Sequence, residues 1–538
     1  MTIQAFAAAL VAKYGYPDEK ALLFPTATIA SRCIDFLIDK SVVGPSNDPN
    51  LEISSKLVRG KDVRLVELIF QDETAIVPNS SSLQAIICAV IFPGKYSDIA
   101  QSYWQHSGEG VSSRRAEFHF KAFEEGHLIP RNSLKEQNDA SPATRKGPRR
   151  YQREELLNSH QSENLDPSIN SSAPNSQRSP EGRGYVQFVE ERFGRNLDLA
   201  MAAKAKLAIR RRIAGSLTAN VDLQTALETH SDTDIHREVK GFSEDDVYLF
   251  PAGMSSIHNV HRTLLAIKGS LKSVCFGFPY LDTLKTLEKW GPGCLFYGHG
   301  VAFDLDDLES RCKRSEKFQA LWCEFPGNPL LKTPDLRRIR SLADEYDFAL
   351  VVDETIANSV NVNVLPFADV LVSSLTKIFS GDANVMGGSV VLNPRGRYYR
   401  QFKEKFAEEY EDNLWPEDAV YIERNSRDYI SRCLRINNNA EVICQVLITS
   451  RLVKDLYYPK FNSTRHFYDA HRNPNGGYGM TETDITSSPY ALLAHYKELE
   501  WAEQYGVDRY LIRFSVGLEG PEELASMLQQ ALTELETQ

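Results

Sequence analysis

The chain has few cysteines and none of them is spaced for a shared site. Regular C-x-x-C spacing is the usual mark of metal cages, and small disulfide frameworks need a much higher cysteine density. His258 and His261 are three residues apart on a predicted helix, but no third ligand of suitable spacing follows. We therefore expect no metal site, and a reduced protein located in the cytoplasm. The eight cysteines are Cys33, Cys88, Cys275, Cys294, Cys312, Cys323, Cys433 and Cys444.

Long apolar runs are also missing. No run approaches the ~20 residues that a membrane-spanning helix requires. The first residues contain a short apolar patch at Phe6–Ala12 without a preceding basic stretch, which is atypical of a signal peptide. The sequence therefore predicts neither a membrane partner nor a cleaved leader.

Positive charge is not in excess, because the formal net charge is −11. Binding to nucleic acid requires a concentrated basic surface. The most basic run, KAKLAIRRRIAG at residues 204–215, has helical spacing and predicts a solvated basic face beside an apolar stripe. We expect small-molecule partners and no nucleic acid.

One segment has too few large apolar residues to fold. Residues 131–184 are rich in Ser, Asn, Pro and charged side chains. Burial in such a segment cannot offset the entropy of ordering it. We predict a disordered linker here, preceded by an N-terminal extension, residues 1–130, whose role is not evident. Within the extension, runs such as VRLVELIF and LQAIICAVIF are typical of strands or buried helix turns.

What the chain does have, after the linker, is a series of short apolar runs alternating with helix-length segments. The runs are DVYLF, SVCFGFPY, ALWCEFPGNP, FALVVDET, ADVLVSS and GGSVVLNP. This alternation is typical of a mostly parallel sheet covered by helices on both faces, and it predicts an α/β fold. Ligands of such folds bind at the carboxyl ends of the strands. The residues that follow each run are therefore the candidates for a functional site.

The first candidate is the turn that contains Gly253 and Met254. It follows DVYLF and opens a predicted helix with glycine and small hydroxyl residues. Free N–H groups and the helix dipole make such a turn an anion cradle. The same pattern also occurs as an ordinary helix N-cap, and it is not a nucleoside-triphosphate loop.

The second candidate is Asp353, at the end of FALVV. A carboxylate after a buried strand is poorly solvated unless it meets a positive partner, for which a protonated ring nitrogen would serve. A helix cap or a loop ion pair is the alternative explanation.

The third candidate is Lys377, which follows Ser374 and Thr376 in SSLTK. A strand-end lysine that points to water is the simpler reading of this pentapeptide alone. Combined with the cradle and Asp353, however, it predicts a pyridoxal 5′-phosphate site. The lysine forms a Schiff base with the cofactor, the hydroxyls reach its phosphate, and the glycines after Lys377 let the next strand pack closely.

These motifs resemble the Cys/Met-metabolism pyridoxal-phosphate enzymes of fold type I, most closely the fungal cystathionine γ-synthases. The resemblance implies a cofactor-binding α/β domain at residues 185–395 and a small C-terminal α/β substrate domain at residues 396–538. It also implies a homodimer or homotetramer whose active sites are shared between protomers. The cofactor contacts that it implies are Arg192, Gly253, Met254, Tyr280, Asn328, Asp353, Ser374, Thr376 and Lys377.

The resemblance gives several of these residues specific roles. Tyr280 stacks on the cofactor ring and is a candidate second acid/base, because a nearby cation can tune a phenol. Asn328 lies near the phenolic oxygen of the cofactor, and Arg513 clamps the α-carboxylate of the substrate. Arg192 contacts the phosphate in the neighbouring protomer.

The chain departs from the family pattern in three places. The family's Y-G-G-T turn has Leu281 and Asp282 in place of the two glycines. Glu190 replaces the tyrosine of a Y-x-R motif. The segment between Gly479 and Pro489 is several tens of residues shorter than in relatives, which shortens the substrate domain.

The expected reaction is γ-replacement on an O-acylhomoserine with Lys377 as the proton carrier and cysteine as the nucleophile, giving cystathionine. One alternative is a specialised-metabolism paralogue that adds a carbon or other nucleophile to the vinylglycine-type intermediate. Another is an inactive regulatory homologue. The intact set of Lys377, Asp353, Tyr280 and Arg513 favours an enzyme.

Overall fold

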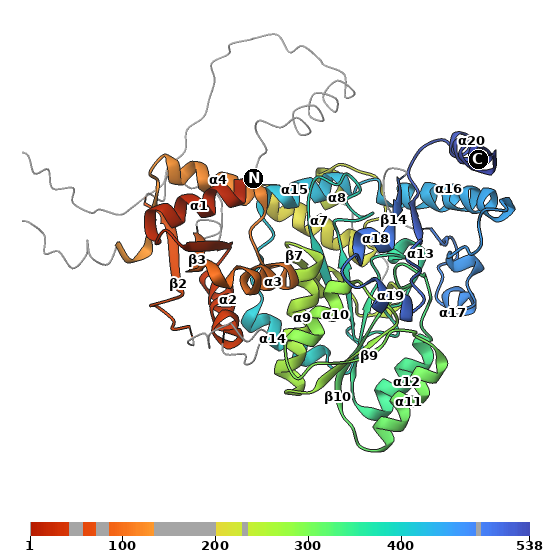
Figure 1. The fold of residues 1–538 in the computed structure, drawn as a ribbon, viewed down its shortest axis with the longest axis horizontal. Helices are drawn as coiled ribbons and strands as arrows, with labels where there is room; N and C mark the ends of the chain where they lie inside the picture. Colours follow the sequence, from red (N-terminus) through yellow and green to blue (C-terminus); the bar gives the residue numbers. More distant parts are fainter. Residues whose placement is uncertain are drawn as a thin grey trace, which may run out of the picture. The chain divides into compact units, whose positions relative to one another are not determined.

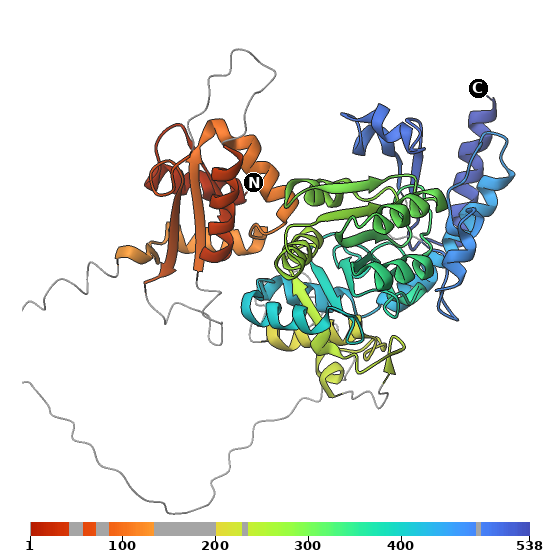
Figure 2. The same cartoon turned by 90° about the horizontal axis from the view of Figure 1, so that it is seen from below.

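The computed structural model describes residues 2–41, 57–71, 86–133, 201–228, 235–479 and 486–537 (Figures 1 and 2). Residues 134–184 of the predicted linker lie outside these ranges, as do Glu190 and Arg192. The chain up to Ile129 and from Leu199 onward forms one compact unit. Among the helices of the described ranges, none combines the length and apolar character that crossing a membrane requires.

The N-terminal residues build a four-stranded sheet in the order β1-β3-β2-β4, with β3 antiparallel to β1 and β2. Successive side chains of β3 face opposite sides. Cys88 and Val90 pack with α2 and α3, while Ile87 and Ala89 pack with α1 and α4. VRLVELIF and LQAIICAVIF supply β2 and β3. The bounds are α1 Thr2–Tyr14, β1 Glu19–Phe24, α2 Ala27–Lys40, β2 Arg64–Phe70, β3 Ile86–Pro93, α3 Ser97–Ser107, α4 Ser113–Glu124 and β4 Leu128–Pro130.

A seven-stranded sheet forms the centre of the remaining chain, in the order β7-β13-β12-β11-β10-β8-β9. All pairs are parallel except those that β13 makes with β12 and β7. The six expected runs each supply one strand, which confirms the predicted α/β fold, and β9 is additional. The bounds are β7 Val247–Phe250, β8 Lys272–Phe276, β9 Cys294–Tyr297, β10 Phe318–Glu324, β11 Ala349–Asp353, β12 Val370–Ser374 and β13 Gly388–Leu392.

Helices cover both faces of this sheet because its strands are apolar on both sides. In β11, Ala349 and Val351 pack toward α9, α10 and α14, whereas Leu350 and Val352 pack toward α7, α11, α12 and α16. Figure 1 shows α11 and α12 side by side. The bounds are α7 Ala202–Ala214, α8 Leu223–Glu228, α9 Gly253–Lys268, α10 Leu281–Lys289, α11 Ala302–Lys313, α12 Leu336–Tyr346, α13 Asn358–Asn361, α14 Tyr399–Glu409, α15 Pro416–Asn425 and α16 Tyr429–Thr449.

The C-terminal residues add a two-stranded antiparallel sheet, β14-β15, in which Ser488 lies opposite Arg513. Residues 480–485 of the shortened segment lie outside the described ranges. The bounds are β14 Thr486–Pro489, β15 Ile512–Ser515, α17 Arg465–Asp469, α18 Tyr490–Ala494, α19 Leu499–Gln504 and α20 Pro521–Thr537. Earlier in the chain, a small two-stranded sheet precedes β7 and consists of β5 Ile235–His236 and β6 Val239–Lys240.

The basic helix α7 differs from the expected solvated face. Arg212 is buried and pairs with the buried Glu423 at 3.0 Å. Lys206 is also nearly buried and pairs with Asp412 at 2.7 Å. The prediction failed because helical spacing identifies a polar face without showing whether acidic residues from elsewhere cover it.

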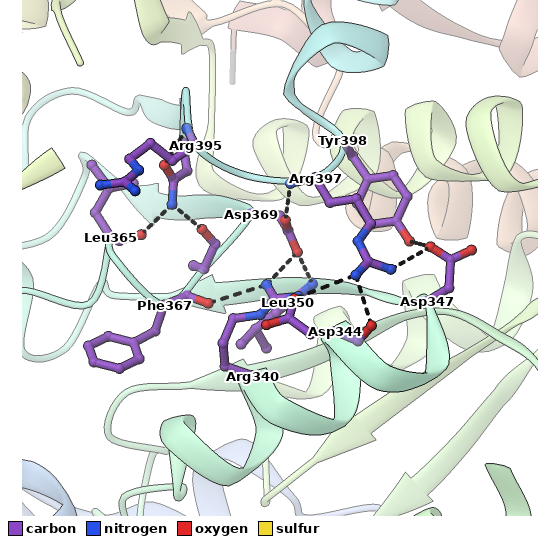
Figure 3. Close-up of polar contacts among 12 residues, drawn as sticks. Arg340, Asp344, Asp347, Leu350, Leu365, Phe367, Asp369, Arg395, Arg397 and Tyr398 are labelled. Carbon is purple, nitrogen blue, oxygen red and sulfur yellow. Dashed lines mark hydrogen bonds and ion pairs between the residues drawn. The ribbon is translucent and has the colours of Figure 1, made fainter. Parts of the chain in front are cut away.

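Asp369 lies just before β12, at the end of the sheet opposite the strand carboxyl ends, and forms hydrogen bonds to three segments there (Figure 3). Its carboxylate accepts hydrogen bonds from Arg340 Nη1 and from the backbone N–H of Leu350, both at 2.8 Å. A third bond comes from the backbone N–H of Arg397 at 3.1 Å. Asp369 therefore connects α12, β11 and the chain after β13.

We expect Asp369→Ala to lower the free energy of unfolding by about 3 to 5 kcal/mol, because it leaves buried donors without their charged acceptor. Urea unfolding followed by circular dichroism measures this. Asp344→Ala is the matched control, because Asp344 also pairs with Arg340 but is 57% exposed, and its loss should cost less than about 1 kcal/mol. Equal effects of the two variants would contradict this assignment.

Candidate functional site

A cavity of about 550 Å³ lies at the carboxyl ends of β10, β11 and β12. It brings together every predicted site residue that the structure describes, whereas Arg192 lies outside the described residues. Glu324 and Tyr490 line it as well, without having been predicted. The lining includes Gly253, Met254, Tyr280, Glu324, Asn328, Asp353, Ser374, Thr376, Lys377, Ser488, Tyr490 and Arg513.

The first turn of α9 opens onto this cavity. Its N-cap residue is Ala252, which has no side-chain hydrogen-bonding group to satisfy the free N–H groups. A Cβ added to Gly253 would lie 2.8 Å from the Cβ of Ser374 and 3.1 Å from its hydroxyl. Glycine is therefore needed where the turn meets β12, and the Ser374 hydroxyl lies beside the free N–H groups. This donor set suits a phosphate.

Thr376 and the glycines after Lys377 build the opposite side of the same turn. The Thr376 hydroxyl accepts a hydrogen bond from the backbone N–H of Gly387 at 3.2 Å. A Cβ on Gly388 would lie 2.2 Å from the carbonyl oxygen of Ala252. The glycines thus let β13 approach the start of α9, as the sequence predicted, while the Thr376 hydroxyl already has a backbone partner.

Asp353 ends β11 at the floor of the cavity. Its carboxylate accepts a hydrogen bond from the backbone N–H of Thr355 at 2.9 Å, and within the described residues no basic side chain pairs with it. Loss of water therefore raises the pKa of Asp353 to about 6, despite the bonds from Thr355. A cationic group of a ligand would supply the missing partner.

Glu324 is a second carboxylate at this floor, at the end of β10. It accepts hydrogen bonds from the backbone N–H groups of Tyr280 and Asn328. Burial and the charge of Asp353 raise the pKa of Glu324 to about 8. In the sequence, the one feature that marks Glu324 as a candidate is its position as the last residue of an apolar run. The same criterion identified Asp353.

Lys377 lies in the turn after β12, exposed on the cavity side. In the described ranges, no carboxylate lies within ion-pairing distance of its ammonium group. Tyr280 precedes α10, and its hydroxyl donates to Asp282 Oδ2 at 3.1 Å. Burial and this carboxylate raise the pKa of Tyr280 well above its usual value. A nearby cation was expected to tune this phenol, and a cation would lower its pKa. The fold instead places the Asp282 carboxylate beside the hydroxyl, and an anion raises the pKa.

Asn328, Tyr490 and Arg513 form another wall. The Asn328 amide donates to the Tyr490 hydroxyl at 3.1 Å, and the Arg513 guanidinium lies 4.9 Å from the Tyr490 ring centre. The Asn328 Oδ1 and Arg513 Nε atoms are buried, and neither has a partner among the described residues. This wall therefore presents an unused acceptor and an unused cationic donor.

His258 and His261 lie inside α9 and away from the cavity lining. Burial lowers the pKa of each to about 4, so both imidazoles are neutral at pH 7. His261 Nε2 is 2.8 Å from the carbonyl oxygen of Trp290. Across the described parts of the chain, no group of three His, Cys, Asp or Glu side chains is placed to hold a metal ion.

Comparison with known proteins gives two family matches and several long relatives. Residues 2–112 match the fungal trans-sulfuration enzyme N-terminal domain, and residues 240–500 match the Cys/Met metabolism PLP-dependent enzyme family. The cystathionine gamma-synthase of Neurospora crassa is 47% identical, over 100% of this chain and 91% of its own.

Two further comparisons show a second long relative and a solved structure. The cystathionine gamma-synthase-like enzyme iboG2 of Amanita muscaria is 36% identical, over 99% of this chain and 88% of its own. The crystal structure of cystathionine gamma synthase from Xanthomonas oryzae is 22% identical and covers 54% of this chain and 82% of its own, with a TM-score of 0.47. With a match over its whole length at 47% identity, this chain belongs to the Cys/Met metabolism PLP-dependent enzyme family.

Proposed function

We propose that this protein catalyses γ-replacement on an O-acylhomoserine with cysteine as the nucleophile, as a cystathionine γ-synthase does. One observation carries the proposal. Among the described residues, a single cavity combines an uncapped helix start, an aspartate and a lysine without ion-pair partners, and an arginine with a free donor. The long relative from Neurospora crassa, named as a cystathionine gamma-synthase, supports the choice of reaction.

The donor set of the cavity fits pyridoxal 5′-phosphate. The N–H groups of Gly253 and Met254 and the Ser374 hydroxyl would hold the phosphate, with Thr376 beside them. Asp353 would face the ring nitrogen, Asn328 the phenolic oxygen, and Lys377 would attach the cofactor. When bound, the cofactor supplies the electron sink that makes the protons of the amino acid acidic. Arg192 would contact the phosphate held by a neighbouring protomer.

The chain's own residues then provide binding and proton transfer. Lys377 Nζ removes the Cα proton of the bound amino acid, a second proton leaves Cβ, and the electrons of that Cβ–H bond expel the acyloxy group from Cγ as the carboxylate. The cysteine thiol loses its proton, its sulfur bonds to Cγ, and protons return to Cβ and Cα. Tyr280 would lie against the cofactor ring. Its raised pKa keeps the phenol neutral at neutral pH, so Tyr280 would act there through hydrogen bonds of its hydroxyl.

Arg513 would bind the α-carboxylate of the substrate, opposite Ser488 in the sheet. We expect Arg513→Lys to raise KM for the acylhomoserine about 10- to 100-fold while kcat changes little, because lysine cannot form the two-pronged bond. Steady-state kinetics test this, with Arg509→Lys as the control. Arg509 pairs with Glu503 and does not line the cavity. An unchanged KM in Arg513→Lys would assign the carboxylate to another residue.

The reaction is tested by offering O-acetylhomoserine with cysteine and a β-keto acid in competition and identifying products by mass spectrometry. Cystathionine as the main product supports the proposal. A carbon–carbon adduct would instead indicate specialised metabolism, for which the altered Leu281-Asp282 turn offers a structural basis. Release of 2-oxobutanoate alone would mean elimination without that nucleophile. No turnover of any kind would favour an inactive homologue.

We also propose that residues 185–395 and 396–538 act as cofactor and substrate domains after the extension at residues 1–130 and the linker at residues 131–184. The free state of all eight cysteines supports a cytoplasmic location. Shared active sites are supported by exposed apolar side chains in the cavity lining, where Met386 is 52% and Leu493 71% exposed. Light scattering after size exclusion tests for the homodimer or homotetramer.

A further inference from the structure

Residues 105–109, here called the contact segment, touch the start of both α9 and α10. They belong to the part of the compact unit that precedes the linker, residues 2–129, which is called the N-terminal unit from here on. Gly108 is at the C-terminal end of α3 with φ of 61°. A Cβ at Gly108 would lie 2.6 Å from the backbone nitrogen of Ser255. The segment therefore lies directly against the turn that we assign to phosphate binding.

Glu109 fixes the contact segment to α9. Its carboxylate is 2% exposed and accepts a hydrogen bond from Asn259 Nδ2 at 3.1 Å. Arg32 and Tyr103 of the N-terminal unit donate to the same carboxylate at 2.6 Å and 3.1 Å. This buried set of bonds holds the segment in one position relative to α9.

Gln105 and His106 connect the segment to Asp282 in the first turn of α10. Gln105 Nε2 lies 3.1 Å from each Asp282 carboxylate oxygen, and His106 Nε2 lies 3.4 Å from Oδ1. Asp282 Oδ2 in turn accepts the hydroxyl of Tyr280 at 3.1 Å. The route from the N-terminal unit to the cavity is thus two hydrogen bonds long.

The surroundings of His106 determine which ring nitrogen carries the proton. Its Nδ1 lies 3.1 Å from Lys289 Nζ and 3.2 Å from the Ser102 hydroxyl. An ammonium group can only donate, so Nδ1 accepts and the proton is on Nε2, which faces Asp282. Asp282 therefore faces donors from Gln105, His106 and Tyr280. Burial alone would raise the pKa of Asp282, but the bonds from His106 and Gln105 lower it below its usual value.

We propose that Gln105, His106 and Asp282 are positioning residues for Tyr280, so that the N-terminal unit completes the active site of the same chain. The inference rests on the proposed function, because it assumes that Tyr280 serves the cofactor. It gives a structural role to Asp282, which stands where the family pattern has glycine. The Gln105 amide and the His106 imidazole orient the Asp282 carboxylate. This carboxylate accepts the hydrogen bond of the Tyr280 hydroxyl and thereby fixes the position of the Tyr280 ring.

A double-mutant cycle on the full-length, cofactor-loaded protein tests the inference. We expect His106→Leu to lower kcat/KM about 10-fold, since a bond to a charged group is lost, and His106→Gln to restore much of it through its amide donor. In a Tyr280→Phe background, His106→Leu should have no further effect. The dissociation constant of pyridoxal 5′-phosphate for the apoprotein, measured by absorbance titration, should follow the same pattern.

Control variants distinguish a failure of the positioning inference from a failure of the proposed function. Arg59→Ala removes an exposed ion pair with Asp35 in the same N-terminal unit and should change neither quantity. Gln105→Ala alters an exposed side chain, and it provides the same test if His106→Leu does not fold. If Tyr280→Phe alone has no effect, the role assigned to Tyr280 under the proposed function is wrong. If Tyr280→Phe is impaired but the His106 or Gln105 effect persists undiminished in that background, the positioning inference is overturned.

Discussion

Lys377→Ala is expected to lower kcat at least about 1,000-fold, within the range that a lost proton-transfer group commonly costs. The loss should be severe because Lys377 is the only lysine among the described residues that line the cavity, so no other ammonium group described there can attach the cofactor and move the Cα proton. The variant should also lack the visible absorbance of covalently attached cofactor, even when it binds cofactor from solution. Absorbance spectra and single-turnover kinetics measure the two effects separately.

Lys272→Ala is the matched control for this experiment. Lys272 is an exposed residue at the opposite, amino end of β8 in the same sheet. Its replacement should leave both the spectrum and the rate unchanged. A Lys377→Ala protein that kept its visible absorbance and its rate would show that another group attaches the cofactor.

Asp353→Asn is expected to lower kcat about 100-fold or more, because a neutral amide no longer favours a protonated ring nitrogen. The cavity gives this nitrogen no substitute, since Glu324 is already engaged by the N–H groups of Tyr280 and Asn328. Asparagine retains nearly the same shape, so the effect should come from charge. Steady-state kinetics of the loaded variant measure the loss.

The same substitution should stabilise the apoprotein, with a defined pH dependence. The pKa of Asp353 is raised from 3.8 to about 6 in the folded chain. Between these values the folded state holds a proton that the unfolded state has lost, so stability falls as the pH rises through this window. Asparagine carries no charge, so it removes the free-energy cost of burying the ionised carboxylate. The melting temperature of the variant should exceed that of the parent at pH 8, and the difference should vanish near pH 4.

Cofactor binding should stabilise the parent more than Asp353→Asn, because the cofactor supplies the positive partner of Asp353. The rise in melting temperature on adding pyridoxal 5′-phosphate should therefore be larger for the parent than for Asp353→Asn. Differential scanning calorimetry at pH 8, with and without cofactor, provides all four values. If the apoprotein variant is less stable at pH 8, the carboxylate has a cationic partner that the described residues do not include.

Local sequence patterns were sufficient for six of the seven strands of the central sheet and for most of the candidate site. Each apolar run became a strand because its side chains can be buried on both faces, and the polar residues after the runs met at one edge because parallel strands end together. Strand β9 was not predicted, because CLFY is too short to stand out between Gly293 and Gly298. Tyr490 was missed because a residue's place beside a cavity is not a local property, whereas Glu324 was missed although it ends an apolar run as Asp353 does.

The sequence by itself determined the fold class, the strand-end residues Asp353 and Lys377, and the glycine turn at Gly253, because each depends on neighbours along the chain. Only the tertiary structure decided that Arg212 is buried, that burial and Asp282 raise the pKa of Tyr280, and that His106 contacts Asp282. Such pairs join residues up to hundreds of positions apart. Their energies depend on burial and distance, and both are fixed only when the chain has folded.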